Sequence, residues 1–120
     1  MNRRTERINS LLRDEISHIL LDDLKDPRIS SMVSVTRVDV SSDLGFAKVY
    51  VSVMGVDSEK RNTMKVLKLA AGFVRRSLRG RISLRALPSI AFHLDNSIEN
   101  DAEILRLIRE STISKHLSES

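Results

Sequence analysis

Nine basic side chains lie in the middle third of the chain with no acidic residue among them. They are Lys60, Arg61, Lys65, Lys68, Arg75, Arg76, Arg79, Arg81 and Arg85. The formal net charge of the chain is only +4, because acidic residues outnumber basic ones elsewhere. A long stretch with one sign of charge is typical of a surface that binds a polyanion. We expect it to contact RNA phosphates, with a solvated basic surface as the simpler alternative.

A smaller basic group lies near residue 1, where Arg3, Arg4, Arg7 and Arg13 fall outside the apolar stripe of a predicted helix, and the first three of these enter the predicted site. With the central stretch it gives the predicted RNA-binding residues: Arg3, Arg4, Arg7, Lys65, Lys68, Gly72, Arg75, Arg76, Arg79 and Arg81. The glycine is included because it lets another backbone approach closely. Contacts between such cations and phosphates fix affinity and register but read little sequence.

Catalytic and metal-binding patterns are not evident. His18, His93 and His116 share no metal-ligand spacing, and the chain has no cysteine. Asp22 and Asp23 are adjacent, so on a helix their side chains point about 100° apart. The sequence also has no glycine-rich phosphate loop. We therefore predict a protein that is not an enzyme and that uses no metal or cofactor.

The four aromatic residues do not suggest a surface for stacking bases. Phe46, Tyr50 and Phe92 are most simply core residues. Phe73 directly follows Gly72, and we expect it to pack beneath the helices there, with base stacking as the alternative.

The element expected to position the first arginines is a helix that ends near Leu24. Its apolar residues recur at helical spacing: Ile8, Leu11, Leu12, Ile16, Ile19 and Leu20. Thr5 is its expected N-cap. The proline of Asp26-Pro27-Arg28 then prevents the helix from continuing.

Two strands follow and are predicted to form an antiparallel hairpin. Val33 and Val35 occupy odd positions, whereas Val38 and Val40 occupy even ones. This change of parity predicts a bulge near Thr36-Arg37. The second strand alternates without a slip at Ala47, Val49, Val51 and Val53. The segment 41–45 between the strands is rich in turn-forming residues.

The central basic stretch is predicted to be helical from a cap at Asp57 or Ser58. Its apolar stripe comprises Met64, Leu67, Ala71, Val74, Leu78 and Ile82. Glycine costs a helix interior about 1 kcal/mol relative to alanine. We therefore interpret Ala70-Ala71-Gly72 as a kink between two helices, and the second helix would offer free backbone N–H groups to an anion beside Arg75 and Arg76.

A third strand is predicted from Pro88 to about Asp95, and a last helix from Glu99 to Glu110. The long helical connection permits the second and third strands to be parallel neighbours. The sequence thus predicts an α+β fold, α-β-β-α-kink-α-β with a three-stranded mixed sheet and a C-terminal helix. Residues 1–110 form one domain in this prediction, and residues 111–120 a flexible C-terminal tail.

Composition is compatible with a soluble cytoplasmic protein. The 120 residues suit a single domain, and no apolar stretch approaches the length of a membrane span. Charges interrupt the N-terminal region where a signal peptide would be apolar. The absence of cysteine fits a reducing compartment.

Several short motifs, in this order and spacing, resemble bacterial ribosome-binding factor A. They are Arg7 to Leu20, Asp26-Pro27-Arg28, Val35-Thr36, Asp43-Leu44, Ala47 to Ser52, Ala71-Gly72 before Val74-Arg75, and Pro88 to Phe92 with Asp95 and Ser97. The resemblance covers about residues 3 to 110 and implies a type II K-homology-like fold. Ordinary K-homology domains clamp RNA with a Gly-x-x-Gly loop, which this sequence lacks. In the family an alanine-containing helix-kink-helix takes its place, and Ala71-Gly72 matches it.

The resemblance implies a non-enzymatic factor that binds the small (30S) ribosomal subunit and promotes late maturation of its 16S rRNA, above all in the cold. It implies a monomer without membrane contact, and a ribosomal protein or an assembly GTPase is a further candidate partner. The C-terminal region varies in such factors, so we assign no RNA contact to Ile98–Ser120. Two alternatives stay open: a general RNA-binding or chaperone module, and a basic adaptor for an acidic protein.

Overall fold

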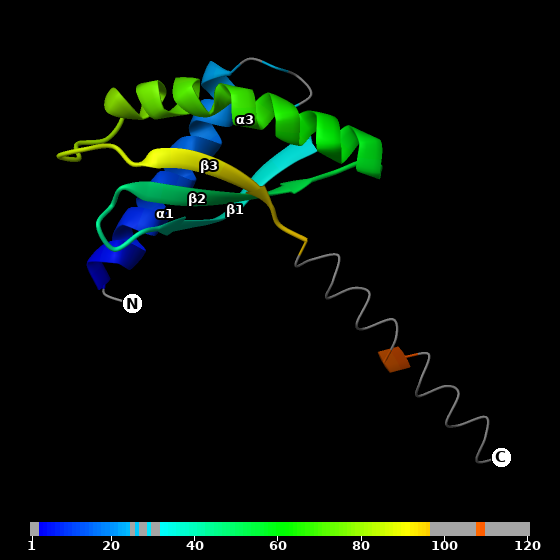
Figure 1. Cartoon of the computed structure of the whole chain (residues 1–120), viewed down its shortest axis with the longest axis horizontal. Coiled ribbons are helices and arrows are strands. Elements are labelled where there is room, and N and C mark those ends of the chain that lie inside the picture. Colours follow the sequence, from blue (N-terminus) through cyan, green and yellow to red (C-terminus); the bar gives the residue numbers. More distant parts are fainter. Residues whose placement is uncertain (1–2, 25, 27–28, 30–31, 97–107, 110–120) are drawn as a thin grey trace, which may run out of the picture.

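The computed structural model describes residues 3–24, 26, 29, 32–96 and 108–109. Its elements are α1 (Arg3–His18), the π-helical turn η1 (Ile19–Asp23), β1 (Val33–Val40), β2 (Phe46–Val53), α3 (Asp57–Arg79) and β3 (Ser89–Leu94). The strands form one sheet in the order β1-β2-β3. β1 is antiparallel to β2, and β2 is parallel to β3 (Figure 1). The predicted α+β class and mixed sheet are confirmed.

The sheet and the helices share one core on a single face of the sheet. Residues of β2 alternate between buried and more accessible positions, so Val49 and Val51 face the core while Lys48 and Tyr50 face away. The buried residues of α1 and α3 belong to the same cluster: Leu12, Ile16, Leu67, Val74 and Leu78. The helices therefore cover one face of the sheet, and the described residues leave its other face uncovered.

The predicted bulge in β1 is confirmed. Val35 pairs with Val51 and Arg37 pairs with Tyr50, so Thr36 is an extra residue between them. Its hydroxyl lies 2.6 Å from Asp95 Oδ2 and donates to it. The bulge lets the valines before and after it face the same core, as the change of parity requires.

The side chains of Ser41 and Asp43 hold the turn between β1 and β2. Asp43 Oδ1 accepts hydrogen bonds from the Ser41 hydroxyl at 2.7 Å and from the Gly45 N–H at 2.9 Å. These bonds hold the pKa of Asp43 below its ordinary value, the Ser41 bond most of all. Leu44 adopts a φ of 60°, the left-handed conformation that a tight turn needs.

The first helix differs from its prediction at its start. Thr5 lies within α1, which already includes Arg3, so the predicted N-cap is wrong. Leu11 lies at the edge of the apolar stripe and is 41% exposed. The far end agrees, because η1 stops at Leu24, whose N–H donates to the Ile19 carbonyl. Asn9 of α1 accepts a hydrogen bond from the Val40 N–H, which ties this helix to the edge strand β1.

The kink predicted at Ala70-Ala71-Gly72 is wrong. α3 is one helix of 23 residues from Asp57 to Arg79. Gly72 faces solvent, and its cost of about 1 kcal/mol is too small to interrupt a helix whose opposite side is buried along its length. The N-cap is Val56, so the predicted caps Asp57 and Ser58 are also wrong. No second helix begins beside Arg75, and the predicted anion site on its first turn is therefore absent.

The third strand agrees with its prediction in both position and pairing. Observed at Ser89–Leu94, it buries Phe92 and lies parallel to β2, as the long helical connection permits. The helix predicted at Glu99–Glu110 lies outside the described residues, apart from the helical pair Ile108 and Arg109. The predicted tail 111–120 also lies outside them.

Candidate nucleic-acid interface

The outer face of α3 presents a row of exposed cations. Lys65, Lys68, Arg76 and Arg79 are all exposed, on the side of the helix opposite to its buried stripe. Their placement follows from helical periodicity, because they occupy the positions that the apolar residues leave. The structure thus brings these four predicted residues onto one helix and into solvent.

An open groove runs beside the first half of α3. Its volume is about 510 Å³, and its lining comprises Asp57, Lys60, Arg61, Met64, Lys65, Lys68, Leu94 and Asn96. Four of these residues are basic and one is acidic, so the groove favours an anion. Lys60 and Arg61 were not among the predicted contacts, although the acid-free stretch already contained them. Asn96 follows β3, and no sequence signal singles it out.

Gly72 interrupts the side chains on the outer face of α3. Among the described residues, a Cβ built there would meet only the Arg76 Nη1 atom, at 3.4 Å. Leu69, one turn earlier, is 88% exposed. The predicted close approach of another backbone to Gly72 is therefore sterically open, although α3 is not interrupted there.

Arg75 differs from its neighbours because its guanidinium is used inside the molecule. Its Nη2 donates to the Leu87 carbonyl at 3.0 Å and its Nε to the Pro88 carbonyl at 3.2 Å. These bonds join α3 to the segment that leads into β3. The position that was predicted to contact phosphate thus supports the fold.

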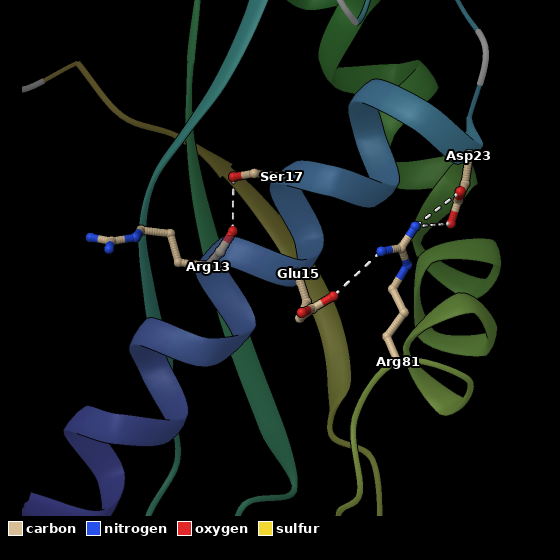
Figure 2. Close-up of polar contacts among 5 residues, drawn as sticks. All are labelled: Arg13, Glu15, Ser17, Asp23 and Arg81. Carbon is tan, nitrogen blue, oxygen red and sulfur yellow. Dashed lines mark hydrogen bonds and ion pairs between the residues drawn. The ribbon is translucent and has the colours of Figure 1, made fainter.

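Arg81 is also held by partners within the chain. Its Nη2 lies 3.0 Å from Asp23 Oδ2, and its Nη1 lies 3.5 Å from Glu15 Oε2 (Figure 2). The hydrogen bond with Asp23 raises the pKa of the guanidinium. Two carboxylates therefore offset the charge that the sequence predicts for an RNA contact.

The basic group on α1 does not join the α3 face. Arg3 and Arg7 are exposed and line an open depression with Glu6 and Ser10. The end of α1, not its start, lies beside α3 (Figure 1). Arg3 and Arg7 thus lie apart from the basic face of α3.

Within the described ranges, no three residues of the types His, Cys, Asp and Glu lie close enough to hold a metal ion. The same part of the chain contains no helix long and apolar enough to cross a membrane.

The family model of ribosome-binding factor A matches residues 4–108. A ribosome-binding factor A from Acetivibrio thermocellus is 52% identical over 109 residues, which cover 91% of this chain and 89% of that protein. The match to the family model extends over the sheet, α3, the basic groove and all but the first residue of α1.

Solved structures agree with this assignment. The solution NMR structure of a Thermotoga maritima protein is 32% identical, with a TM-score of 0.68 over 78% of this chain and 90% of that one. Ribosome binding factor A of Thermus thermophilus, in coordinates fitted to a cryo-EM map of its 30S complex, shares the fold at 22% identity. Its TM-score is 0.60 over 73% and 91% of the two chains. On the combined match in sequence and fold, this chain belongs to the ribosome-binding factor A family.

Proposed function

We propose that this protein binds the small ribosomal subunit through its 16S rRNA and promotes late maturation and processing of that RNA without catalysing a reaction. The observation that carries the proposal is the groove of about 510 Å³ beside α3, with Lys60, Arg61, Lys65 and Lys68 in its lining. Family membership supports the ribosome as the target. The 30S complex of the Thermus thermophilus relative supports the small subunit as the partner.

The chemistry of the interface is recognition of the RNA backbone. Lysine and arginine side chains neutralise phosphates, which gives affinity and a steep salt dependence. Lys65, Lys68, Arg76 and Arg79 extend this surface beyond the groove, and Gly72 gives an RNA backbone room to approach. Arg3, Arg4 and Arg7 supply a second contact on α1. Specificity then comes from the shape of the folded RNA.

In this proposal residues 1–110 act as a monomeric K-homology-like RNA-binding domain in the cytoplasm. A protein without catalytic groups changes the folding of an RNA only by binding one conformation more tightly than another. Misfolded RNA escapes more slowly as temperature falls. The protein is therefore most needed in the cold, when a small difference in affinity decides how much of the 16S rRNA matures.

Reversing one charge in the groove tests the interface. In Lys68→Glu we expect the protein to leave the small-subunit fraction on a sucrose gradient, with a shallower salt dependence of binding. Arg13→Glu is the matched control, because it makes the same change in charge at an exposed arginine of α1 outside the predicted site. Equal loss of binding in both variants would contradict the proposed interface.

Loss of the gene tests the cellular role. At low temperature the deletion strain should accumulate immature small subunits that contain precursor 16S rRNA. Normal subunit ratios without precursor would favour the general RNA-binding module. Equal affinity of the purified protein for small subunits and for unrelated free RNA would favour that module too.

A further inference from the structure

The face of the sheet that the helices leave uncovered carries a row of planar side chains. Arg37, Tyr50 and His93 are register partners across the three strands. The Arg37 guanidinium carbon lies 4.2 Å from the centroid of the Tyr50 ring. On the other side, the Tyr50 and His93 ring centroids are 5.6 Å apart with an interplanar angle of 33°. One planar group from each strand thus forms a continuous stack.

The outer members of this row are open to solvent. The Arg37 side chain is 59% exposed, and Asp39 holds its Nε at 3.3 Å. His93 is exposed at the other end of the row. The stack is therefore ordered by the sheet before any ligand binds, and a planar ligand can extend it over the guanidinium or over the imidazole.

A further ring on the same face is exposed to solvent. Phe46 is 63% exposed and faces the same side of β2 as Tyr50, four residues away. Four residues along a strand span about 13 Å, so the two rings are separated by room for more than one nucleotide. The prediction that Phe46 and Tyr50 belong to the core is wrong, whereas Phe92 is buried and Phe73 packs against the core.

The charges between these rings suit a nucleic acid. Lys48 is exposed between Phe46 and Tyr50 on β2, and small Ala91 lies next to it on β3. Lys48 adds a second cation to this face beside Arg37, and Asp39 is both its register partner on β1 and the ion-pair partner of Arg37. Planar groups that alternate with cations are the arrangement that single-stranded RNA requires, because bases stack on aromatic rings and guanidinium planes while cations contact the backbone.

We propose that this uncovered sheet face binds a single-stranded segment of RNA, with bases stacked on the Arg37–Tyr50–His93 row and on Phe46. The assignment of RNA as the ligand rests on the proposed function. The site is separate from the α3 groove and recognises a different feature of the RNA. The groove contacts backbone phosphates, whereas the sheet face requires unpaired bases. The two sites together would favour rRNA in which a helix adjoins an unpaired strand.

The composition of the chain provides a direct readout. Tyr50 is the only tyrosine, and the chain has no tryptophan. The intrinsic fluorescence of the intact protein therefore reports on the centre of the proposed stack. A single-stranded oligoadenylate should quench this fluorescence along its binding curve. A duplex RNA of equal length should bind through α3 with little quenching.

Variants separate stacking from structure. We expect Tyr50→Thr to bind the single strand roughly tenfold more weakly, and Phe46→Thr to lose affinity by a similar factor. Tyr50→Phe keeps the ring and should keep the affinity. If Tyr50→Thr does not fold, Phe46→Thr still decides, because an exposed side chain at the end of the strand contributes little to the core.

The result distinguishes this proposal from the proposed function. Lys68→Glu should reduce binding to small subunits while the single strand still quenches Tyr50. Binding of the single strand without quenching, and with unchanged affinity in Phe46→Thr, would overturn the stacking site. The variants could instead leave RNA binding unchanged and abolish binding of a ribosomal protein. That result would also overturn the stacking site and identify the sheet face as a protein-binding surface.

Discussion

The Nη2 atom of Arg81 donates to both carboxylate oxygens of Asp23, at 3.1 and 3.0 Å (Figure 2). This forked contact joins the turn after α1 to the segment after α3. Arg81 was predicted to bind RNA because it belongs to the acid-free stretch. In three dimensions two distant acidic residues lie next to it, so separation of charge along the sequence does not require separation in space.

Replacing Arg81 should therefore reduce stability. We expect Arg81→Gln to lower the free energy of unfolding by a small amount, since the guanidinium loses its hydrogen bonds to Asp23 and Glu15 at the surface. Urea denaturation measures this change. Asp23→Asn should cost a similar amount, and the double variant should lose much less than the sum. Two results would instead support an RNA contact at Arg81. One is a double variant whose loss of stability equals the sum of the two single losses, and the other is a stable Arg81→Gln protein that no longer binds RNA.

Arg75 should have a larger effect on stability than its neighbour. Arg75→Ala removes two hydrogen bonds to the carbonyls of Leu87 and Pro88, and we expect a loss of about 2 kcal/mol. Arg75→Lys should not restore it, because a single ammonium does not reproduce the guanidinium fork. Arg76→Ala is the control, and this exposed residue should change stability by less than about 0.5 kcal/mol. Equal effects of Arg75→Ala and Arg76→Ala in urea would contradict the structural role.

Local periodicity was sufficient to predict most of the fold. The change of valine parity in β1 identified the bulge at Thr36, because a buried face imposes strict alternation. The parallel pairing of β2 and β3 is the arrangement that the long helical connection between them permitted. The kink at Gly72 was wrong because the penalty of one glycine was weighed without the burial that supports the rest of α3.

The candidate sites were less predictable, because their members come from separate elements. Lys65 and Lys68 were found from charge alone, but Asn96 reaches the same groove only through the fold. Tyr50 was assigned to the core since alternation does not say whether the second face of a sheet is covered. The stack with Arg37 and His93 depends on register across three strands, which the sequence does not specify residue by residue.

Gly72 offers a test of helix continuity. Its surroundings leave room for a methyl group, because the nearest neighbour of a Cβ among the described residues would be the flexible Arg76 Nη1 at 3.4 Å. We expect Gly72→Ala to raise the free energy of unfolding by about 1 kcal/mol and the melting temperature by ~4 °C. If RNA approaches the glycine closely, the same variant should bind small subunits more weakly. A lower melting temperature would show that α3 is distorted at this position.

Gly55 should respond to the same substitution with the opposite sign. Its φ of +122° disfavours any side chain, and a Cβ there would lie 2.7 Å from Glu59 Oε2 and 3.1 Å from Met32 Cε. We expect Gly55→Ala to lower the free energy of unfolding by about 1–3 kcal/mol. Thermal unfolding followed by circular dichroism compares the two alanine variants directly. A Gly55→Ala protein as stable as the wild type would mean that this connection before α3 adapts without strain.

Asp43 should make the stability of the hairpin depend on pH. Hydrogen bonds from Ser41 and Gly45 hold its pKa below the ordinary value of 3.8, so the folded protein favours the carboxylate more than the unfolded chain does. The resulting stabilisation is fully present above the unfolded pKa and is lost as pH falls through the folded one. Unfolding of wild type and Asp43→Asn in urea at several pH values should show a difference in stability at pH 6 that shrinks below about pH 4.

Because the Asp43 carboxylate is exposed to solvent, the effect on stability should be small. Ser41→Ala should raise the pKa of Asp43 towards its ordinary value in a carboxyl NMR titration. A stability difference that stays constant down to pH 2 would exclude Asp43 as the titrating group.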